Sequence, residues 1–137
     1  MPSRPTQHVA YVASLSVIAV LCVSVARAEG PPAVSRRIVL SEPASVPDRD
    51  AIMALVELPP SSSEGRHTHP GELFGFVLEG SISLESEGRP TLTLKAGDAY
   101  HVLPGRVHNV LNRGTATART AVVLVAEKGK PPTSELK

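Results

Sequence analysis

Cysteine and aromatic side chains are scarce in this chain. Its 137 residues include one cysteine, Cys22, no tryptophan, two tyrosines and two phenylalanines. A single cysteine cannot form a disulfide within the chain, so the fold has to be stable without one. Basic residues are not clustered either, apart from Arg36 and Arg37. A nucleic-acid-binding surface needs clustered positive charge and aromatic stacking platforms, and we therefore expect no nucleic-acid partner.

Long hydrophobic runs are confined to the N-terminal end. Residues 9–25 are almost wholly apolar or small, Arg4 precedes them, and an Ala-Arg-Ala segment follows at residues 26–28. This order predicts a secretory signal peptide over residues 1–28, with a retained N-terminal anchor as the alternative. Cleavage after the segment predicts a periplasmic or secreted protein without a stable membrane span.

The rest of the chain alternates between short β-type segments and turns. Glycine and proline interrupt segments rich in Val, Leu and Ile about every 8–12 residues, and no segment has a sustained helical period. This pattern is typical of an all-β sandwich or barrel of the jelly-roll type. We expect one domain over residues 37–127, a flexible lead-in at 29–36 and a polar tail at 128–137. Residues 117–125 are the most apolar run, which predicts a central strand.

Two of the four histidines after residue 28 form the sequence His67-Thr68-His69. In a β-strand, residues two apart point to the same face, so both imidazoles can reach one ion. Imidazole is a preferred ligand for Zn, Cu, Fe and Ni. The alternative is that the pair consists of two surface histidines in a loop.

The surroundings of this pair resemble two sequence motifs of the cupin superfamily. The first motif spans residues 65–80 and contains the pair, and the second spans residues 97–112 and contains His108. The resemblance covers residues 52–127. It implies a single small jelly-roll β-barrel with antiparallel strands, in which His108 joins the pair around one divalent transition metal (Fe, Zn, Ni, Cu or Mn).

The match departs from the family pattern at one ligand position. Where the family has a glutamate, this chain has Leu73, and Glu72 lies one residue earlier. A one-residue offset in a strand turns a side chain to the opposite face. Either the metal site consists of three histidines, which we favour, or a bulge after Pro70 and Gly71 turns Glu72 inward as a fourth ligand. A site of three neutral imidazoles suits Zn, Cu, Ni or Fe(II) better than Mn.

Other residues of the two motifs have structural interpretations. Asn112 is expected to brace a turn, and His101 is expected on the face of its strand away from the metal. Tyr100 fits a core aromatic better than a hydroxyl donor in the pocket. Phe74 and Phe76 share one strand face and fit core packing better than a pocket wall.

Two functions remain open at this point. The resemblance implies an enzyme that acts on a small organic molecule, for example an organic acid, through the metal. The alternative is a non-catalytic periplasmic protein that binds a metal or a small ligand. A solvent-connected pocket with polar groups beside the metal would favour the enzyme, and an interior filled by leucines would favour binding. Cupins are often dimers, and the strand from Arg37 could contribute to a homodimer interface.

Overall fold

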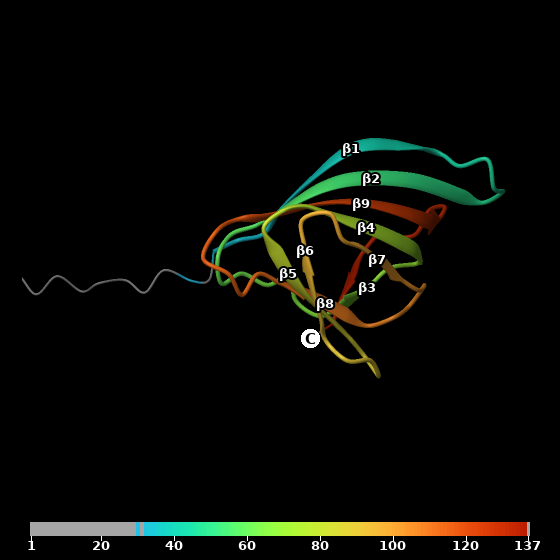
Figure 1. Ribbon diagram of the computed structural model, residues 1–137. Helices are drawn as coiled ribbons and strands as arrows, with labels where there is room; N and C mark the ends of the chain where they lie inside the picture. Colours follow the sequence, from blue (N-terminus) through green and yellow to red (C-terminus); the bar gives the residue numbers. More distant parts are fainter. Residues whose placement is uncertain (1–29, 31, 137) are drawn as a thin grey trace, which may run out of the picture.

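The computed structural model describes residue 30 and residues 32–136 (Figure 1). The predicted signal peptide lies outside these residues. The described part of the chain contains no helix that is long and apolar enough to cross a membrane. Its elements are all strands: β1 (Ser35–Pro43), β2 (Arg49–Leu58), β3 (His67–Thr68), β4 (Gly71–Glu79), β5 (Ser81–Ser86), β6 (Leu92–Lys95), β7 (Ala99–Val102), β8 (His108–Leu111), β9 (Ala118–Glu127) and β10 (Ser134–Glu135).

Hydrogen bonds join these strands into two five-stranded antiparallel sheets. The first has the order β1-β2-β9-β4-β7, and the second has the order β10-β3-β8-β5-β6. The two sheets lie one above the other in Figure 1. Their facing sides share one core, to which β2, β4 and β9 contribute from the first sheet and β5 and β8 from the second. The predicted all-β jelly-roll architecture is confirmed, although the hydrogen bonds form two sheets rather than one closed cylinder.

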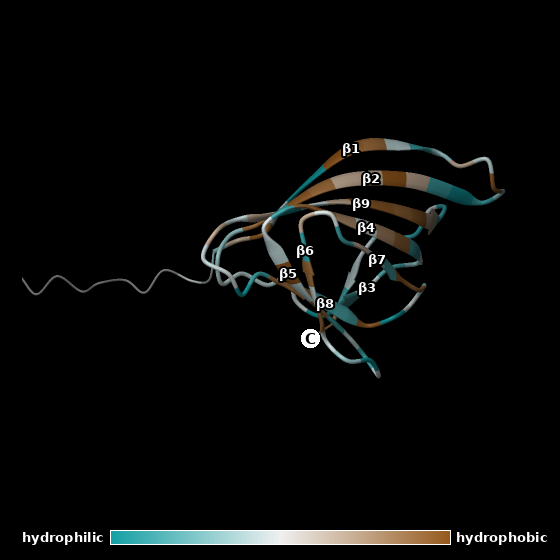
Figure 2. Ribbon diagram, in the orientation of Figure 1, coloured by the Kyte–Doolittle hydropathy of each residue, from teal (hydrophilic) through white to brown (hydrophobic). Residues whose placement is uncertain are grey.

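The most apolar segment is a central strand, as its composition predicts. β9 pairs with β2 on one side and with β4 on the other, and its apolar run over residues 121–126 gives the strand its hydrophobic colour in Figure 2. The backbone N–H and C=O groups of a central strand are hydrogen-bonded to a neighbour on each side. Its side chains can therefore be apolar, and Val and Leu pack well against the core beneath.

β4 separates its side chains strictly by phase. Leu73 and Val77 point into the core, with 6% and 0% of their surface exposed. Phe74 and Phe76 point outward and are 46% and 44% exposed. The expectation that the two phenylalanines pack in the core is therefore wrong, because they share the phase of Glu72 and not that of Leu73.

Tyr100 belongs to the core and also lines the cavity between the sheets, and a glycine makes room for its ring. It lies in β7 opposite Gly75 of β4 and is 9% exposed. A Cβ atom on Gly75 would lie 2.1 Å from Cζ of Tyr100, so any side chain there would displace the ring. The glycine therefore lets the phenol lie against β4 inside the fold.

Candidate metal centre

Three buried histidines meet where β3 and β8 pair. His67 in β3 is the register partner of His108 in β8, and His69 follows directly after β3. Their exposed fractions are 2% for His67, 3% for His108 and 8% for His69. We call these three residues the histidine cluster. The two-residue spacing and the cross-strand pairing bring all three rings to one side of the second sheet.

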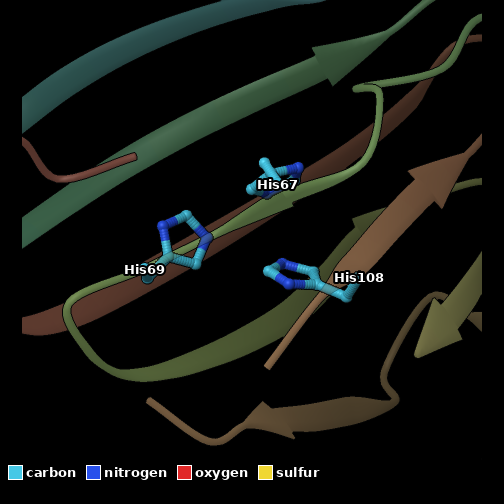
Figure 3. Close-up of side chains that lie close together, drawn as sticks. All are labelled: His67, His69 and His108. Atoms are coloured by element: carbon cyan, nitrogen blue, oxygen red, sulfur yellow. The ribbon is translucent and has the colours of Figure 1, made fainter. Parts of the chain in front are cut away.

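The rings of the histidine cluster face one another (Figure 3). One ring nitrogen of each residue lies within 4.8 Å of the others. The ring centroids are 4.2 Å apart for His67 and His108, 4.9 Å for His67 and His69, and 5.1 Å for His69 and His108. This spacing is compatible with three nitrogens around one ion after a small contraction.

Backbone carbonyls fix the orientation of each imidazole. In every ring the Nδ1–H group donates a hydrogen bond to a backbone carbonyl oxygen. Nε2 of the neutral imidazole is then unprotonated and keeps its lone pair. The acceptors are Gly65 for His67 at 2.8 Å, Pro132 for His69 at 2.7 Å and Arg106 for His108 at 3.0 Å. The tautomer that a metal ligand needs is therefore already in place.

Burial keeps the histidine cluster neutral. Desolvation lowers the pKa of His67 and of His108, and it lowers the pKa of His69 to about 4. The hydrogen bonds to the backbone carbonyls oppose this effect without cancelling it. Because only the neutral imidazole binds metal, these pKa values favour coordination at neutral pH. The donor set fits a divalent transition metal.

Glu72 is not part of this site. Its side chain is exposed on the outer face of β4, where its Oε1 lies 3.9 Å from Nε2 of His101. The register between β4 and β9 is regular from Gly71 to Val77, so the bulge that would have turned Glu72 inward does not form. Of the two alternatives from the sequence, the inward Glu72 is thus wrong for the described structure, and Leu73 lines the cavity instead.

His101 and Asn112 lie where the sequence places them. His101 is on the outer face, where its ring stacks on Phe74 with centroids 4.7 Å apart. Asn112 is 2% exposed and donates from Nδ2 to the carbonyls of Leu58 and Ala116, both at 2.8 Å. It therefore braces the chain around the β8–β9 connection and does not approach the metal centre as a ligand.

One acidic residue at the site escaped the sequence analysis. The side chain of Glu64 is 9% exposed, and its Oε2 lies 3.9 Å from Nε2 of His67. Arg36 of β1 donates to its Oε1 from Nε at 3.2 Å and from Nη2 at 3.0 Å. Burial raises the pKa of the Glu64 carboxyl, and the charge of Arg36 opposes this rise. Glu64 lies in an irregular segment, where no periodicity indicates the direction of a side chain.

The histidine cluster opens into a cavity of about 200 Å³. Its polar side carries Arg36, Glu64 and Thr133 beside the three imidazoles. Its aliphatic lining comes mainly from β2 and β9, with Ile52 and Leu124 among its residues. A small molecule in this cavity would therefore contact both the histidine cluster and aliphatic side chains.

The C-terminal segment forms one edge of the site. Expected to be a polar tail, it contains β10, which pairs with β3 through Ser134 and Thr68 and through Glu135 and His67. Its Pro132 supplies the carbonyl that accepts the proton of His69. The last turn of the chain therefore orients a candidate ligand.

Comparisons with known proteins agree with this architecture. A curated relative, the tetracenomycin polyketide synthase protein TcmJ of Streptomyces glaucescens, is 31% identical over 86 residues. That alignment covers 62% of this chain and 56% of TcmJ, so the chain spans little more than half the length of this relative.

Two solved structures share the fold, and their sequence identity to this chain is close to that of TcmJ. The polyketide cyclase RemF of Streptomyces resistomycificus is 28% identical with a TM-score of 0.60, over 76% of this chain and 71% of RemF. A predicted oxalate decarboxylase of Thermotoga maritima is 29% identical with a TM-score of 0.58, over 68% of this chain and 80% of that protein.

The family model for the Cupin domain matches residues 54–125. This range is more than half of the chain and includes all three histidines of the cluster. It runs through most of both sheets, from β2 to β9. The chain belongs to the cupin family.

Proposed function

We propose that this protein is a metal-dependent enzyme that converts a small organic acid at the histidine cluster. The observation that carries the proposal is the cavity, which places three oriented imidazoles beside an ionisable carboxyl and a guanidinium. A divalent metal bound there would polarise an oxygen atom of the substrate. The chain's own residues would hold the substrate and exclude water along the apolar walls.

The size and lining of the cavity support a small substrate. A volume of about 200 Å³ is below the ~300–1,000 Å³ that is usual for sites of drug-sized ligands. Arg36 lines this space with 41% of its side chain exposed, so its guanidinium can also meet a carboxylate that enters from solvent. The name of the Thermotoga relative, a predicted oxalate decarboxylase, agrees with an acid as substrate.

A second candidate is a non-catalytic protein that binds a metal or a small ligand. The observation in its favour is the aliphatic character of most cavity walls, including Leu73 at the position of the family's glutamate. Such walls would retain a ligand by apolar contact, without a reaction at the metal.

An assay with a panel of small mono- and dicarboxylic acids separates these functions. The protein is loaded with Fe(II), Zn, Ni, Cu or Mn, and each acid is followed by NMR for product formation. We expect turnover of at least one acid by the wild type and by His101→Ala, whose histidine lies on the outer face, and none by His108→Ala. Binding of acids without turnover would favour the binding protein, and failure of the wild type to bind metal would exclude the metal-dependent enzyme.

Export is also part of the proposal. It is supported by the sequence of residues 1–28 alone. Mass spectrometry of protein recovered from its native host should find a mature N-terminus at residue 29 in the periplasmic or extracellular fraction. An intact N-terminus in a cytoplasmic fraction would contradict export.

The homodimer that the family resemblance allows, although no sequence feature demands it, remains a prediction. β1 is an edge strand whose Ile38, Val39 and Leu40 are 59%, 42% and 48% exposed, and apolar edge strands tend to be covered by another chain. Light scattering should give twice the mass of one chain, and a single-chain mass over a wide concentration range would argue against the dimer.

A further inference from the structure

The carboxylate of Glu64 is only half satisfied by its protein partners. Arg36 contacts Oε1 with two nitrogens, and the hydrogen bond of the Glu64 side chain to a described residue is made by Oε1 and not by Oε2. No buried side-chain oxygen in the described structure lacks a partner, so Oε2 is open to solvent in the cavity that Glu64 lines. A buried carboxylate needs compensation for the water it has lost, and one cation at one oxygen provides this in part. The ring nitrogen Nε2 of His67 lies 3.9 Å from this Oε2 atom.

The separation of 3.9 Å is too long for a hydrogen bond but suits a shared ion. Two metal–ligand bonds of about 2.1 Å can join atoms up to about 4.2 Å apart. Nε2 of His67 is also the nitrogen left free by the hydrogen bond from Nδ1 to Gly65. Both atoms therefore have a lone pair available to one ion. Glu64 lies outside the group of three histidines whose ring nitrogens are within 4.8 Å of one another, so its carboxylate would have to move toward that group to join all three.

The backbone around Glu64 holds it against the strand that carries His108. Its amide donates to the carbonyl of Val110 in β8 at 2.9 Å, and Ser63 forms an isolated bridge with Leu111. Gly65 then adopts a φ of +81°, which turns the chain between Glu64 and His67. This turn allows a residue three positions before a histidine to face the same site.

From this arrangement we propose that Glu64 is the carboxylate ligand of the metal centre, in place of the glutamate that the family has at the position of Leu73. The proposal rests on the metal-binding role of the histidine cluster stated above. It changes the donor set from three nitrogens to three nitrogens and one oxygen. The added negative charge makes the site more suitable for Fe(II) and Mn than three imidazoles alone.

Cobalt(II) is a suitable probe, because its visible spectrum reports the ligands around it. We compare the wild type with Glu64→Gln and Glu64→Ala, and we use Glu72→Gln as the matched control, since Glu72 is an exposed carboxylate on the outer face of β4. Each Glu64 variant should bind Co(II) about tenfold more weakly or worse, with altered visible absorption bands. Glu72→Gln should keep the wild-type affinity and spectrum.

Wild-type affinity and an unchanged spectrum in both Glu64 variants would overturn the proposal while leaving the histidine cluster as a metal site. No stoichiometric Co(II) binding by the wild type would overturn the proposed function as well. Because the Glu64 variants could fail to fold, a second measurement uses the wild type alone. Zinc binding should shift a carboxylate stretching band in the infrared difference spectrum, and a difference spectrum without any carboxylate band would also refute the assignment.

Discussion

Asn112 is a single buried amide that joins three pieces of backbone. Besides its bonds to Leu58 and Ala116, its Oδ1 accepts from the amide of Gly114 at 2.9 Å. In the described structure, all three hydrogen bonds of its side chain are made to backbone atoms. Its presence in the second motif therefore reflects folding and not chemistry at the metal.

Replacement of Asn112 should destabilise the protein without altering its metal site. Asn112→Ala leaves buried carbonyls unsatisfied, and we expect the free energy of unfolding to fall by about 2–4 kcal/mol. Asn109→Ala, which removes an exposed hydrogen bond to Ser63, should cost less than about 1 kcal/mol. Denaturant unfolding measures both values. Equal stability of the two variants, or loss of metal affinity in folded Asn112→Ala, would contradict this role.

The buried imidazoles make the metal-free protein sensitive to acid. In the unfolded chain a histidine has a pKa of about 6.5, whereas burial lowers the pKa of His69 to about 4 in the folded protein. Below pH 6.5 the unfolded chain therefore binds protons that the folded chain does not, and the free energy of unfolding falls. For His69 alone the loss amounts to about 3 kcal/mol by pH 4.

Chemical denaturation of the metal-free protein between pH 7.5 and 4 measures this loss. The stability should be nearly constant above pH 7 and should decline through the range below 6.5. His69→Gln should flatten the decline, because glutamine does not titrate. A stability that rises as the pH falls from 6.5 to 5 would show that these histidines are not buried in the neutral form.

The short strand β10 has a larger effect on the site than its two residues suggest. It pairs with β3, and the residues before it supply the carbonyl of Pro132 for His69 and the side chain of Thr133 for the cavity. Outer hydrogen bonds of this kind fix the orientation of a metal-ligating imidazole. The C-terminal segment therefore helps to orient one imidazole of the candidate metal centre.

Deletion of residues 131–137 should weaken metal binding by about 10–100-fold, because His69 loses its hydrogen-bond acceptor. Competition with a chromophoric chelator measures the affinity, and circular dichroism checks that the sheets remain. Thr133→Val is the control, since its hydroxyl lies at a long 3.4 Å from Nδ1 of His69 and the carbonyl of Pro132 is kept. Full-length affinity in the deletion variant would refute the role of this segment.

The sequence predicts those parts of the site that depend on strand periodicity. The spacing of His67 and His69 places both rings on one face, and the same rule explains why Glu72 points outward while Leu73 points in. Periodicity carries no information in irregular segments. Glu64 is buried because of the positive φ of Gly65 and a contact with the first sheet, which no local pattern indicates.

β10 escaped the sequence analysis for a related reason. Two polar residues after a Pro-Pro pair have no alternation to reveal a strand, and their pairing depends on an exposed edge of β3 far away in the chain. The longer strands were predictable because their apolar residues recur at every second position or form a continuous run. The exposure of Phe74 and Phe76 was missed because phase alone does not tell which face of a strand is buried.

In the described part of the molecule, the residues of the candidate metal centre come from separate parts of the chain and line a cavity between the two sheets. β3, β8 and the C-terminal segment meet at the histidine cluster, while β1 delivers Arg36 to Glu64. A metal ion would bind the folded arrangement and not the unfolded chain, so it would link these segments and raise the melting temperature. Metal content and thermal stability should therefore change together.

The most direct test compares the metal content of the wild type with that of the double variant His67→Ala, His69→Ala. Each protein is exposed to each candidate metal, passed through gel filtration and then measured by elemental analysis. One divalent ion per chain is predicted for the wild type and for His101→Ala, and none for the double variant. A double variant that retains the full complement of metal would show that the ion binds elsewhere and would contradict the assignment of the histidine cluster.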